Sequence, residues 1–280
     1  MEKGVVIITG ASSGFGYLTA VACAKEGYEV LATMRNLEKA NQFEKEDKAI
    51  RDRIHFRQLD VTDHNSIQQF GASLKGEESV AGLINNAGIA VGGFTEEVGV
   101  DEFRKQFDTN FFGAVAVTQF VLPIMRRQGY GKIINLGSIS GRVGFPGLSP
   151  YVASKHALKG WTESLRLEVK PFGVEVALIE AGSYKTNIWT TGTHIPDEAQ
   201  QQSSPYRFYM EALQREFQTS SETHGDPEEI ARLIVEILQE KRTTKLFRPV
   251  GKGVKVMMGS KTLLSWRSWE KLLLKQLFKR

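Results

Sequence analysis

The chain has 280 residues, of which 41% are hydrophobic and 24% charged, and this composition predicts an ordinary globular protein rather than a largely disordered one. Residues 255–280 hold seven Lys/Arg and one Glu, so the rest of the chain has a net charge of −2 although the whole has +4. The body shows no basic groove with interleaved aromatics, which excludes a nucleic-acid partner. A single cysteine, Cys23, excludes an internal disulfide, and without a Cys/His cluster no metal site is expected.

The N-terminal residues carry no targeting signal. The apolar run at residues 5–8 is too short for a signal peptide. No stretch is expected to reach the ~18 apolar residues that a spanning helix needs. We therefore predict a cytoplasmic protein.

Short β-branched runs alternate with helical-period segments up to about residue 180, which predicts βα units and a parallel sheet. Strands are expected at residues 4–9, 29–33, 54–59, 82–85, 132–136 and 175–179, and helices at 15–26, 36–48, 65–74, 101–128 and 150–170. Residues 183–225 are polar and irregular, and we interpret them as a substrate lid. A helix at 226–241 and a last strand at 246–250 complete the pattern.

This order predicts an α/β fold of the Rossmann type, a doubly wound parallel sheet of about seven strands with helices on both faces. We expect one dinucleotide-binding and catalytic domain over residues 1–255, followed by a basic amphipathic extension over 256–280.

A glycine-rich turn lies between the first strand and the first helix, with the sequence Thr-Gly-Ala-Ser-Ser-Gly-Phe-Gly at residues 9–16. Glycines let the backbone turn tightly and approach a pyrophosphate, whose charge is favoured at a helix N-terminus. Such a turn alone is weak evidence, but its place at the first βα junction predicts a cofactor site.

Arg35 follows the second strand, where an NAD-binding protein commonly has an acid. Its guanidinium is suited to a 2′-phosphate, so NADP(H) is favoured over NAD(H). Asp60 ends the third strand, and Asn85-Asn86-Ala87-Gly88 ends the fourth. Ligands of open α/β sheets bind outside the carboxyl ends of the strands, so these residues are expected at the same crevice.

Tyr151 and Lys155 are four residues apart on a predicted helix, and Ser138 stands at the end of the fifth strand. The i, i+4 spacing puts the phenol and the ammonium on one helix face. A nearby cation is expected to lower the tyrosine pKa from its usual value of about 10, which would make the phenol a usable proton donor and acceptor.

Together these motifs resemble the short-chain dehydrogenase/reductase family in its compact, single-domain form, over residues 4 to about 186. The resemblance places the catalytic tetrad at Asn110, Ser138, Tyr151 and Lys155. It implies cofactor contacts from Gly10, Ser12, Ser13, Gly14, Phe15, Gly16, Arg35, Asp60, Val61, Asn86, Ala87, Gly88, Tyr151, Lys155 and Thr186.

By the same resemblance, each member of the tetrad has a role. Tyr151 would protonate the substrate oxygen, Ser138 would orient the carbonyl, and Lys155 would hold the ribose hydroxyls and lower the tyrosine pKa. Asn110 would position a water, and Thr186 would bind the nicotinamide carboxamide. Relatives of this kind act on small-molecule carbonyls or alcohols and form homodimers or homotetramers.

Two positions depart from the family pattern. Ala181 stands where a proline is usual after the sixth strand, which leaves the geometry of that loop less certain than the chemistry. Ser13 stands where NADP-preferring members often have a basic residue, so the preference for NADP(H) depends mainly on Arg35. A non-catalytic NADP(H)-binding redox sensor is the alternative, but such a sensor needs no proton-transfer residues.

The lid and the tail each leave two interpretations open. The lid contributes Trp189, Tyr206, Phe208, Tyr209 and Met210, which would either wall a pocket for a bulky apolar substrate, as in hydroxysteroid and retinol dehydrogenases, or pack the lid onto the body. In the tail, a basic stripe (Arg267, Lys271, Lys275, Lys279) opposes an apolar one (Leu263, Trp266, Trp269, Leu273, Leu274, Leu277). Such a helix is typical either of peripheral membrane contact, here through residues 261–280, or of packing on the body or a partner subunit.

Overall fold

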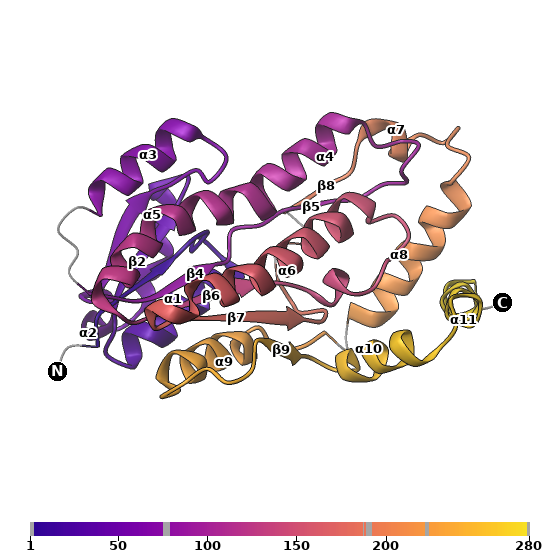
Figure 1. The fold of residues 1–280 in the computed structure, drawn as a ribbon. Coiled ribbons are helices and arrows are strands. Elements are labelled where there is room, and N and C mark those ends of the chain that lie inside the picture. The colour runs from indigo at the N-terminus through magenta and orange to yellow at the C-terminus, as the bar shows by residue number, and fades with distance from the viewer. Residues whose placement is uncertain (1–2, 75–78, 187, 189–191, 222–223, 279–280) are drawn as a thin grey trace.

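A computed structural model describes residues 3–74, 79–186, 188, 192–221 and 224–278. Its centre is a seven-stranded parallel sheet in the order β3-β2-β1-β4-β6-β7-β9 (Figure 1). The strands are β1 (Val5–Ile8), β2 (Glu29–Met34), β3 (Ile54–Gln58), β4 (Val80–Asn85), β6 (Gly131–Leu136), β7 (Val174–Ala181) and β9 (Phe247–Val250). The doubly wound Rossmann-type fold predicted from the sequence is confirmed.

Helices cover both faces of the sheet, because its strands are apolar on both sides. On one face α1 (Gly14–Lys25) and α9 (Glu228–Gln239) pack on Val6, Ile8 and Ile134. On the other face lie α3 (His64–Ser73), α5 (Gly113–Gln128) and α6 (Ser149–Val169), which pack on Ile7, Leu83 and Ile133. Alternate side chains along each strand thus point to opposite faces of the sheet and fill two separate hydrophobic cores.

The strand order reverses at β1, which has β2 on one side and β4 on the other. This reversal marks the place where doubly wound sheets bind dinucleotides, in a crevice outside the carboxyl ends of the strands. A small parallel pair, β5 (Ala90–Val91) with β8 (Thr193–His194), lies beyond this edge.

Two predicted helices differ from the structure. Residues expected as one helix over 36–48 form a 3-10 helix, Leu37–Lys45, and a short α2 (Lys48–Arg51), because Phe43 is the one buried side chain of the two segments. The helix expected over 101–128 is divided into α4 (Val100–Phe107), a π-helical turn (Asp108–Phe112) and α5.

The run Val100–Gln128 is also long and apolar enough to cross a membrane, judged by length and composition alone. The expectation that no stretch reaches that threshold is therefore wrong on composition. In the structure α5 from this run packs on the sheet through Val117, Val121 and Met125.

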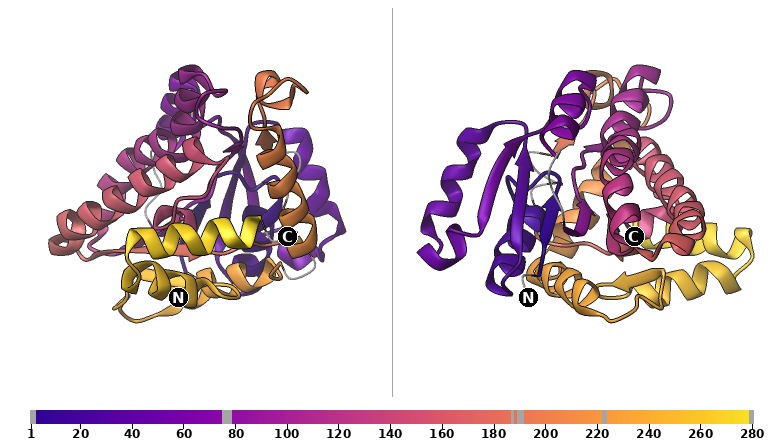
Figure 2. Two further views of the ribbon diagram at one scale, coloured as in Figure 1. Left: turned by 90° about the vertical axis from the view of Figure 1, so that its right-hand side faces the viewer. Right: turned by 60° about the vertical axis from the view of Figure 1, so that its left-hand side comes forward.

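The lid and the tail contain more regular structure than the sequence predicts. Within 183–225 the structure has α7 (Asp197–Gln200) and α8 (Arg207–Ser221). The tail forms two helices, α10 (Val254–Leu263) and α11 (Trp266–Leu277), rather than one, because the Ser265 hydroxyl accepts from the amide of Ser268 and starts a new helix. Figure 2 shows α11 lying across the end of the molecule beside α8.

Candidate active site

The glycine-rich turn after β1 is shaped by close backbone approach. Gly10 has a φ of +66°, and a Cβ there would lie 2.9 Å from the Cα of Ala87. A Cβ on Gly16 would collide with the carbonyl oxygen of Gly10. Side chains at these positions would close the turn, so glycine is required for its shape.

The N-terminus of α1 opens into this turn. Ser13 is its N-cap residue, and its side chain makes no capping hydrogen bond. The first amide groups of a helix need a partner, and together with the helix dipole they favour an anion. The bare turn and uncapped amides therefore fit the pyrophosphate of a dinucleotide, which the residues from Gly10 to Gly16 would hold.

The turn after β4 is fastened to the first one. The Thr9 hydroxyl oxygen accepts from the amides of Asn86 at 2.9 Å and Ala87 at 3.0 Å, and Asn86 Nδ2 donates to the Thr9 carbonyl oxygen at 2.8 Å. These bonds set the spacing of the two turns that border the crevice. Asn86, Ala87 and Gly88 thus lie where the sequence predicts.

The other predicted cofactor residues border the same crevice. Arg35 is exposed after β2 and forms no ion pair with any described residue. Asp60 accepts from the Thr62 amide and hydroxyl at 2.9 and 2.7 Å, while Val61 is buried beside it. Thr186 is 3.7 Å from the position that a Cβ of Gly14 would take.

The four predicted catalytic residues come from three different elements and are all buried. Ser138 is the N-cap of the short 3-10 helix Ile139–Gly141 that follows β6, Tyr151 and Lys155 lie on α6, and Asn110 lies in the π-helical turn. Tyr151 shares a hydrogen bond with Ser138. Lys155 Nζ donates to the Leu136 carbonyl oxygen at 2.7 Å and lies 5.6 Å from the centroid of the Tyr151 ring.

Burial shifts the pKa values of the tyrosine and the lysine in opposite directions. It raises the pKa of Tyr151 to about 12, although the hydrogen bond with Ser138 opposes this shift. It lowers the pKa of Lys155 to about 8. The net lowering of the tyrosine pKa expected from the sequence is therefore wrong for the protein alone, because loss of solvent outweighs the neighbouring groups. Tyr151 keeps its proton at neutral pH.

Asn110 and Gln106 both hold the segment that leads into β5. The Ile89 amide donates to Asn110 Oδ1 at 2.9 Å, and Asn110 Nδ2 donates to the Ile89 carbonyl oxygen at 3.0 Å. Gln106, one turn earlier, accepts from the Val91 amide at 2.7 Å and donates to the same Ile89 oxygen. The Asn110 amide group is thus engaged by backbone. Sequence reasoning missed Gln106, whose signal is only a polar residue on a buried helix face.

Asn85, which the sequence places at the cofactor crevice, instead belongs to a second buried polar set below the turn after β4, whose other members sequence reasoning missed. Asn85 Nδ2 donates to Asn135 Oδ1 at 2.8 Å and to the Thr118 hydroxyl at 3.0 Å, and Asn135 Nδ2 donates to the Thr162 hydroxyl at 2.8 Å. This chain links β4, β6, α5 and α6. It fixes the strands that carry Asn86 and Ser138 to the helix that carries Tyr151.

A comparison with known families decides the identity of this fold and site. The family model described as short chain dehydrogenase matches residues 4–194. The chain belongs to the short-chain dehydrogenase family. The oxidoreductase class indicated by the motifs is thereby supported, and the non-catalytic sensor is not favoured.

Two curated relatives are similar over most of the dehydrogenase chain. The uncharacterized oxidoreductase YusZ of Bacillus subtilis is 47% identical over 280 residues, which cover 99% of this chain and all of the relative. Human 17-beta-hydroxysteroid dehydrogenase type 1 is 32% identical over 252 residues, 87% of this chain and 76% of that one.

Two solved structures share the fold of the dehydrogenase. A short-chain dehydrogenase from Streptomyces avermitilis has a TM-score of 0.82 and 31% identity, with 98% of each chain covered. ElxO with NADP bound has a TM-score of 0.74 and 25% identity, with 91% of this chain and all of that chain covered.

The lid of the dehydrogenase is attached by aromatic stacking. Phe94 stacks on Tyr206 and Tyr209, with ring centroids 4.6 and 5.1 Å apart, and Phe278 of the tail stacks on Tyr209 at 4.8 Å. Tyr209 thus lies between the loop after β5 and the end of the chain. The predicted pocket residue Trp189 lies outside the described residues.

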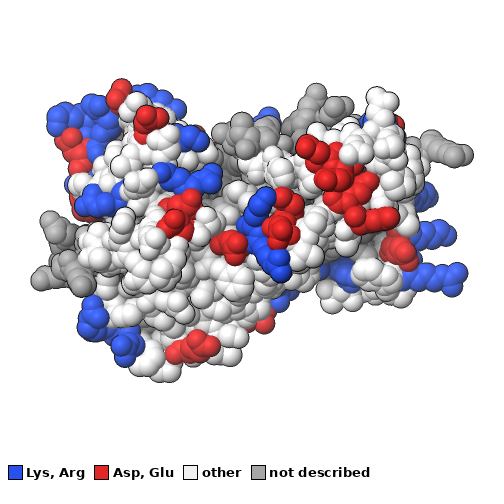
Figure 3. All heavy atoms as spheres, turned by 90° about the horizontal axis from the view of Figure 1, so that it is seen from above, with Lys and Arg blue, Asp and Glu red and all other residues white. Residues whose placement is uncertain are grey.

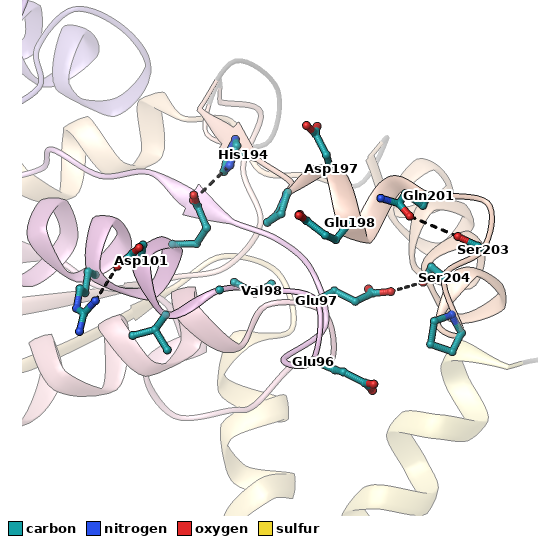
Figure 4. A pocket seen from close by; sticks show the side chains of 16 residues that line it. Glu96, Glu97, Val98, Asp101, His194, Asp197, Glu198, Gln201, Ser203 and Ser204 are labelled. Carbon is teal, nitrogen blue, oxygen red and sulfur yellow. Dashed lines mark hydrogen bonds and ion pairs between the residues drawn. The ribbon is translucent and has the colours of Figure 1, made fainter.

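An acidic hollow of about 920 Å³ borders the lid, between the loop after β5 and α7 (Figure 4). Figure 4 shows Ser204 bonded to Glu97. His194 Nε2 lies 3.2 Å from a carboxylate oxygen of Glu102. Figure 3 shows acids gathered on this part of the upper surface. Asn110, Ser138, Tyr151 and Lys155 do not line the hollow, and the bond from Ser204 to Glu97 fastens the predicted lid to the body.

One side chain of the tail is buried in a hydrophobic cluster that includes the loop after β6. Trp269 of α11 is 2% exposed and clusters with Ile139, Val143 and Val254. Ile139 directly follows Ser138. One face of α11 therefore packs on the body, as one of the two interpretations of the tail requires.

Proposed function

We propose that the chain is an NADP(H)-dependent oxidoreductase that interconverts a carbonyl and a primary or secondary alcohol, with a bulky apolar substrate. The observation that carries this proposal is the convergence of Ser138, Tyr151 and Lys155, all buried, beside a bare glycine turn at a helix N-terminus. A tyrosine that keeps its proton next to a titratable lysine is suited to donate that proton to a developing alkoxide.

In this mechanism NADPH, when bound, supplies the hydride. The hydroxyl groups of Ser138 and Tyr151 hydrogen-bond the substrate oxygen, and Tyr151 transfers its proton to that oxygen. Lys155, charged below pH about 8, stabilises the phenolate that this transfer leaves and holds the ribose hydroxyls. Asn110 positions a water that returns the proton, and Thr186 holds the carboxamide.

Arg35 supports the preference for NADPH over NADH. Its guanidinium is exposed at the carboxyl end of β2 and forms no ion pair with any described residue. A 2′-phosphate can therefore bind the guanidinium without breaking an existing ion pair. The bound NADP of ElxO, a structure of similar fold, is consistent with this preference.

The bulky apolar substrate is supported by the similarity to a hydroxysteroid dehydrogenase. The rings of Phe94, Tyr206, Tyr209 and Phe278 stack on one another and hold residues 206–209 on the body. Specificity would then depend on how α8 and the tail close over the site.

For its organisation, we propose one catalytic domain over residues 1–255, with 183–225 as the lid and 256–280 as an extension. The protein acts in the cytoplasm as a homodimer or homotetramer, with residues 261–280 in peripheral contact with a membrane. Gel filtration with light scattering measures the assembly directly, and a monomer would contradict it.

The test is calorimetric binding of NADPH and NADH, followed by NADPH oxidation with a panel of bulky and small ketones, aldehydes and quinones. Tyr151→Phe is expected to keep NADPH binding and to lose turnover by about 10²–10⁴-fold, the range for loss of a general acid. Substantial activity in this variant contradicts the role of Tyr151. Tight NADPH binding without turnover across the panel would instead support the redox sensor.

A further inference from the structure

The hairpin formed by α10 and α11 exposes apolar side chains at its turn. Leu263 is 86% exposed and Trp266 66%, with Leu264 between them also exposed. We call these three residues the hairpin tip. Trp269, one turn further along α11, is buried and holds the hairpin on the body. The tip is therefore presented by an anchored element, and a cluster of this kind indicates an interaction surface.

A basic hollow of about 630 Å³ adjoins the tip, between α6 and α10. Its charged and titratable lining residues are Arg142, His156, Lys159 and Lys261, and no acid lines it. Leu263 of the tip lies on its rim, and Lys261 Nζ is 3.8 Å from the centroid of the Trp266 ring. The hollow and the tip are thus one continuous surface.

The positive charge of this hollow is only partly neutralised. Arg142 pairs with the buried Glu180, and Lys159 pairs with Glu163 outside the lining. Lys261 forms no ion pair within the described residues, and its charge lies over an aromatic ring instead. A singly charged anion bound in this hollow would neutralise the remaining positive charge.

The surrounding charge also favours an anionic partner. Seven Lys/Arg and one acid occupy residues 255–280, whereas the acids near α4 and α7 lie at a separate hollow. This asymmetry would orient the molecule with the hairpin toward an anionic surface.

We propose that the hairpin tip inserts into an anionic lipid surface and that a lipid phosphate occupies the basic hollow. A tryptophan and two leucines beside lysines match the boundary between acyl chains and headgroups, whereas a soluble polyanion gains nothing from exposed leucines. This inference deepens the proposed membrane contact by naming its residues and its lipid class. Because Phe278, the residue that follows α11, stacks on Tyr209 of the lid, docking would bring the lid close to the membrane.

The experiment is co-sedimentation of the full chain with vesicles of phosphatidylcholine alone or with phosphatidylglycerol added. We expect binding to the mixed vesicles, weakened by salt, and little binding to the neutral ones. Leu263→Ser with Trp266→Ser is expected to abolish binding. Lys159→Gln with Lys261→Gln is expected to weaken it on the order of tenfold or more, since each lysine near an anionic membrane contributes about fivefold.

Controls use substitutions of the same kind elsewhere. Leu167 is 77% exposed on α6 and does not line the hollow, so Leu167→Ser is the control for the loss of one exposed leucine. Lys48→Gln removes a lysine whose side chain is 78% exposed on α2. Both controls are expected to bind vesicles as the unmodified chain does. NADPH oxidation in solution is followed for every variant, so that a failure of the catalytic proposal is seen separately from a failure to dock.

Four outcomes overturn the proposal. The first is no sedimentation of the intact chain with the mixed vesicles. The second is equal binding by the tip variant and its control. The third is that inorganic phosphate or soluble glycerol phosphate binds as tightly as vesicles do, which would make the hollow a site for soluble anions. A change of oligomeric state in the tip variant, with unaltered vesicle binding, would also contradict it and assign the tip to a second copy of the chain.

Discussion

Trp269 is the side chain through which the tail is expected to stabilise the active site. It is 2% exposed and packs with Ile139 and Val143, which follow Ser138 in the catalytic loop. Trp269→Ala removes the indole from this cluster and leaves a cavity between α11 and the loop. The same helix offers a matched control, since Trp266 is 66% exposed.

The expected size of the effect follows from burial. Replacement of a buried tryptophan by alanine costs about 3–5 kcal/mol in the free energy of unfolding. For a chain of this length each kcal/mol lowers Tm by about 2–4 °C, so Trp269→Ala should lower Tm on the order of 10 °C. Trp266→Ala removes a solvated side chain and should change the free energy by about 0.5 kcal/mol or less.

The assay is thermal unfolding followed by circular dichroism, repeated by urea titration, with steady-state kinetics on both variants. We expect Trp269→Ala to lower kcat as well as Tm, because Ser138 loses the packing that fixes its loop, while Trp266→Ala keeps both near the unmodified values. Equal loss of Tm in the two variants would refute the reasoning. So would an unchanged Tm in Trp269→Ala, because the tail would then not be packed on the catalytic loop.

Two further predictions concern the cofactor and the proton. Arg35→Ala should weaken NADPH binding by about 1.5–3 kcal/mol, or roughly 10- to 150-fold, and leave NADH binding nearly unaffected. Parallel calorimetric titrations with the two cofactors would measure this difference. Equal losses of affinity for both cofactors would contradict a contact with the 2′-phosphate. The kcat/KM for reduction should be flat at neutral pH and fall above pH about 8, because Lys155 is charged below its lowered pKa and neutral above it. If kcat/KM instead stays level up to pH 10, Lys155 does not lose its charge near pH 8 and the prediction is wrong.

The sheet could be predicted from the sequence because its strands are buried on both faces and therefore read as continuous β-branched runs. Helix α8 could not, because Arg207–Ser221 is largely polar and its anchor is the stacking of Tyr209 between Phe94 and Phe278. Those partners lie far away in the sequence. The break before α11 was missed for a different reason, since one serine cap there outweighs a continuous amphipathic pattern.

The candidate site divides in the same way. Its glycine turn, Tyr151 and Lys155 form local patterns with fixed spacing, so sequence reasoning finds them. Gln106 and Asn135 make hydrogen bonds across 15 to 50 residues and show no pattern of their own. No sequence pattern predicts the π-helical turn that carries Asn110 either, although such turns often occur at functional sites.

Burial of the proposed catalytic pair sets the protonation states from which the reaction would start. It raises the pKa of Tyr151 to about 12 and lowers that of Lys155 to about 8, so at neutral pH the phenol is protonated and the lysine is still charged. In the proposed reduction the phenol gives its proton to the alkoxide beside a cation that stabilises the phenolate. The environment of Tyr151 thus supports its proposed role as a proton donor at neutral pH.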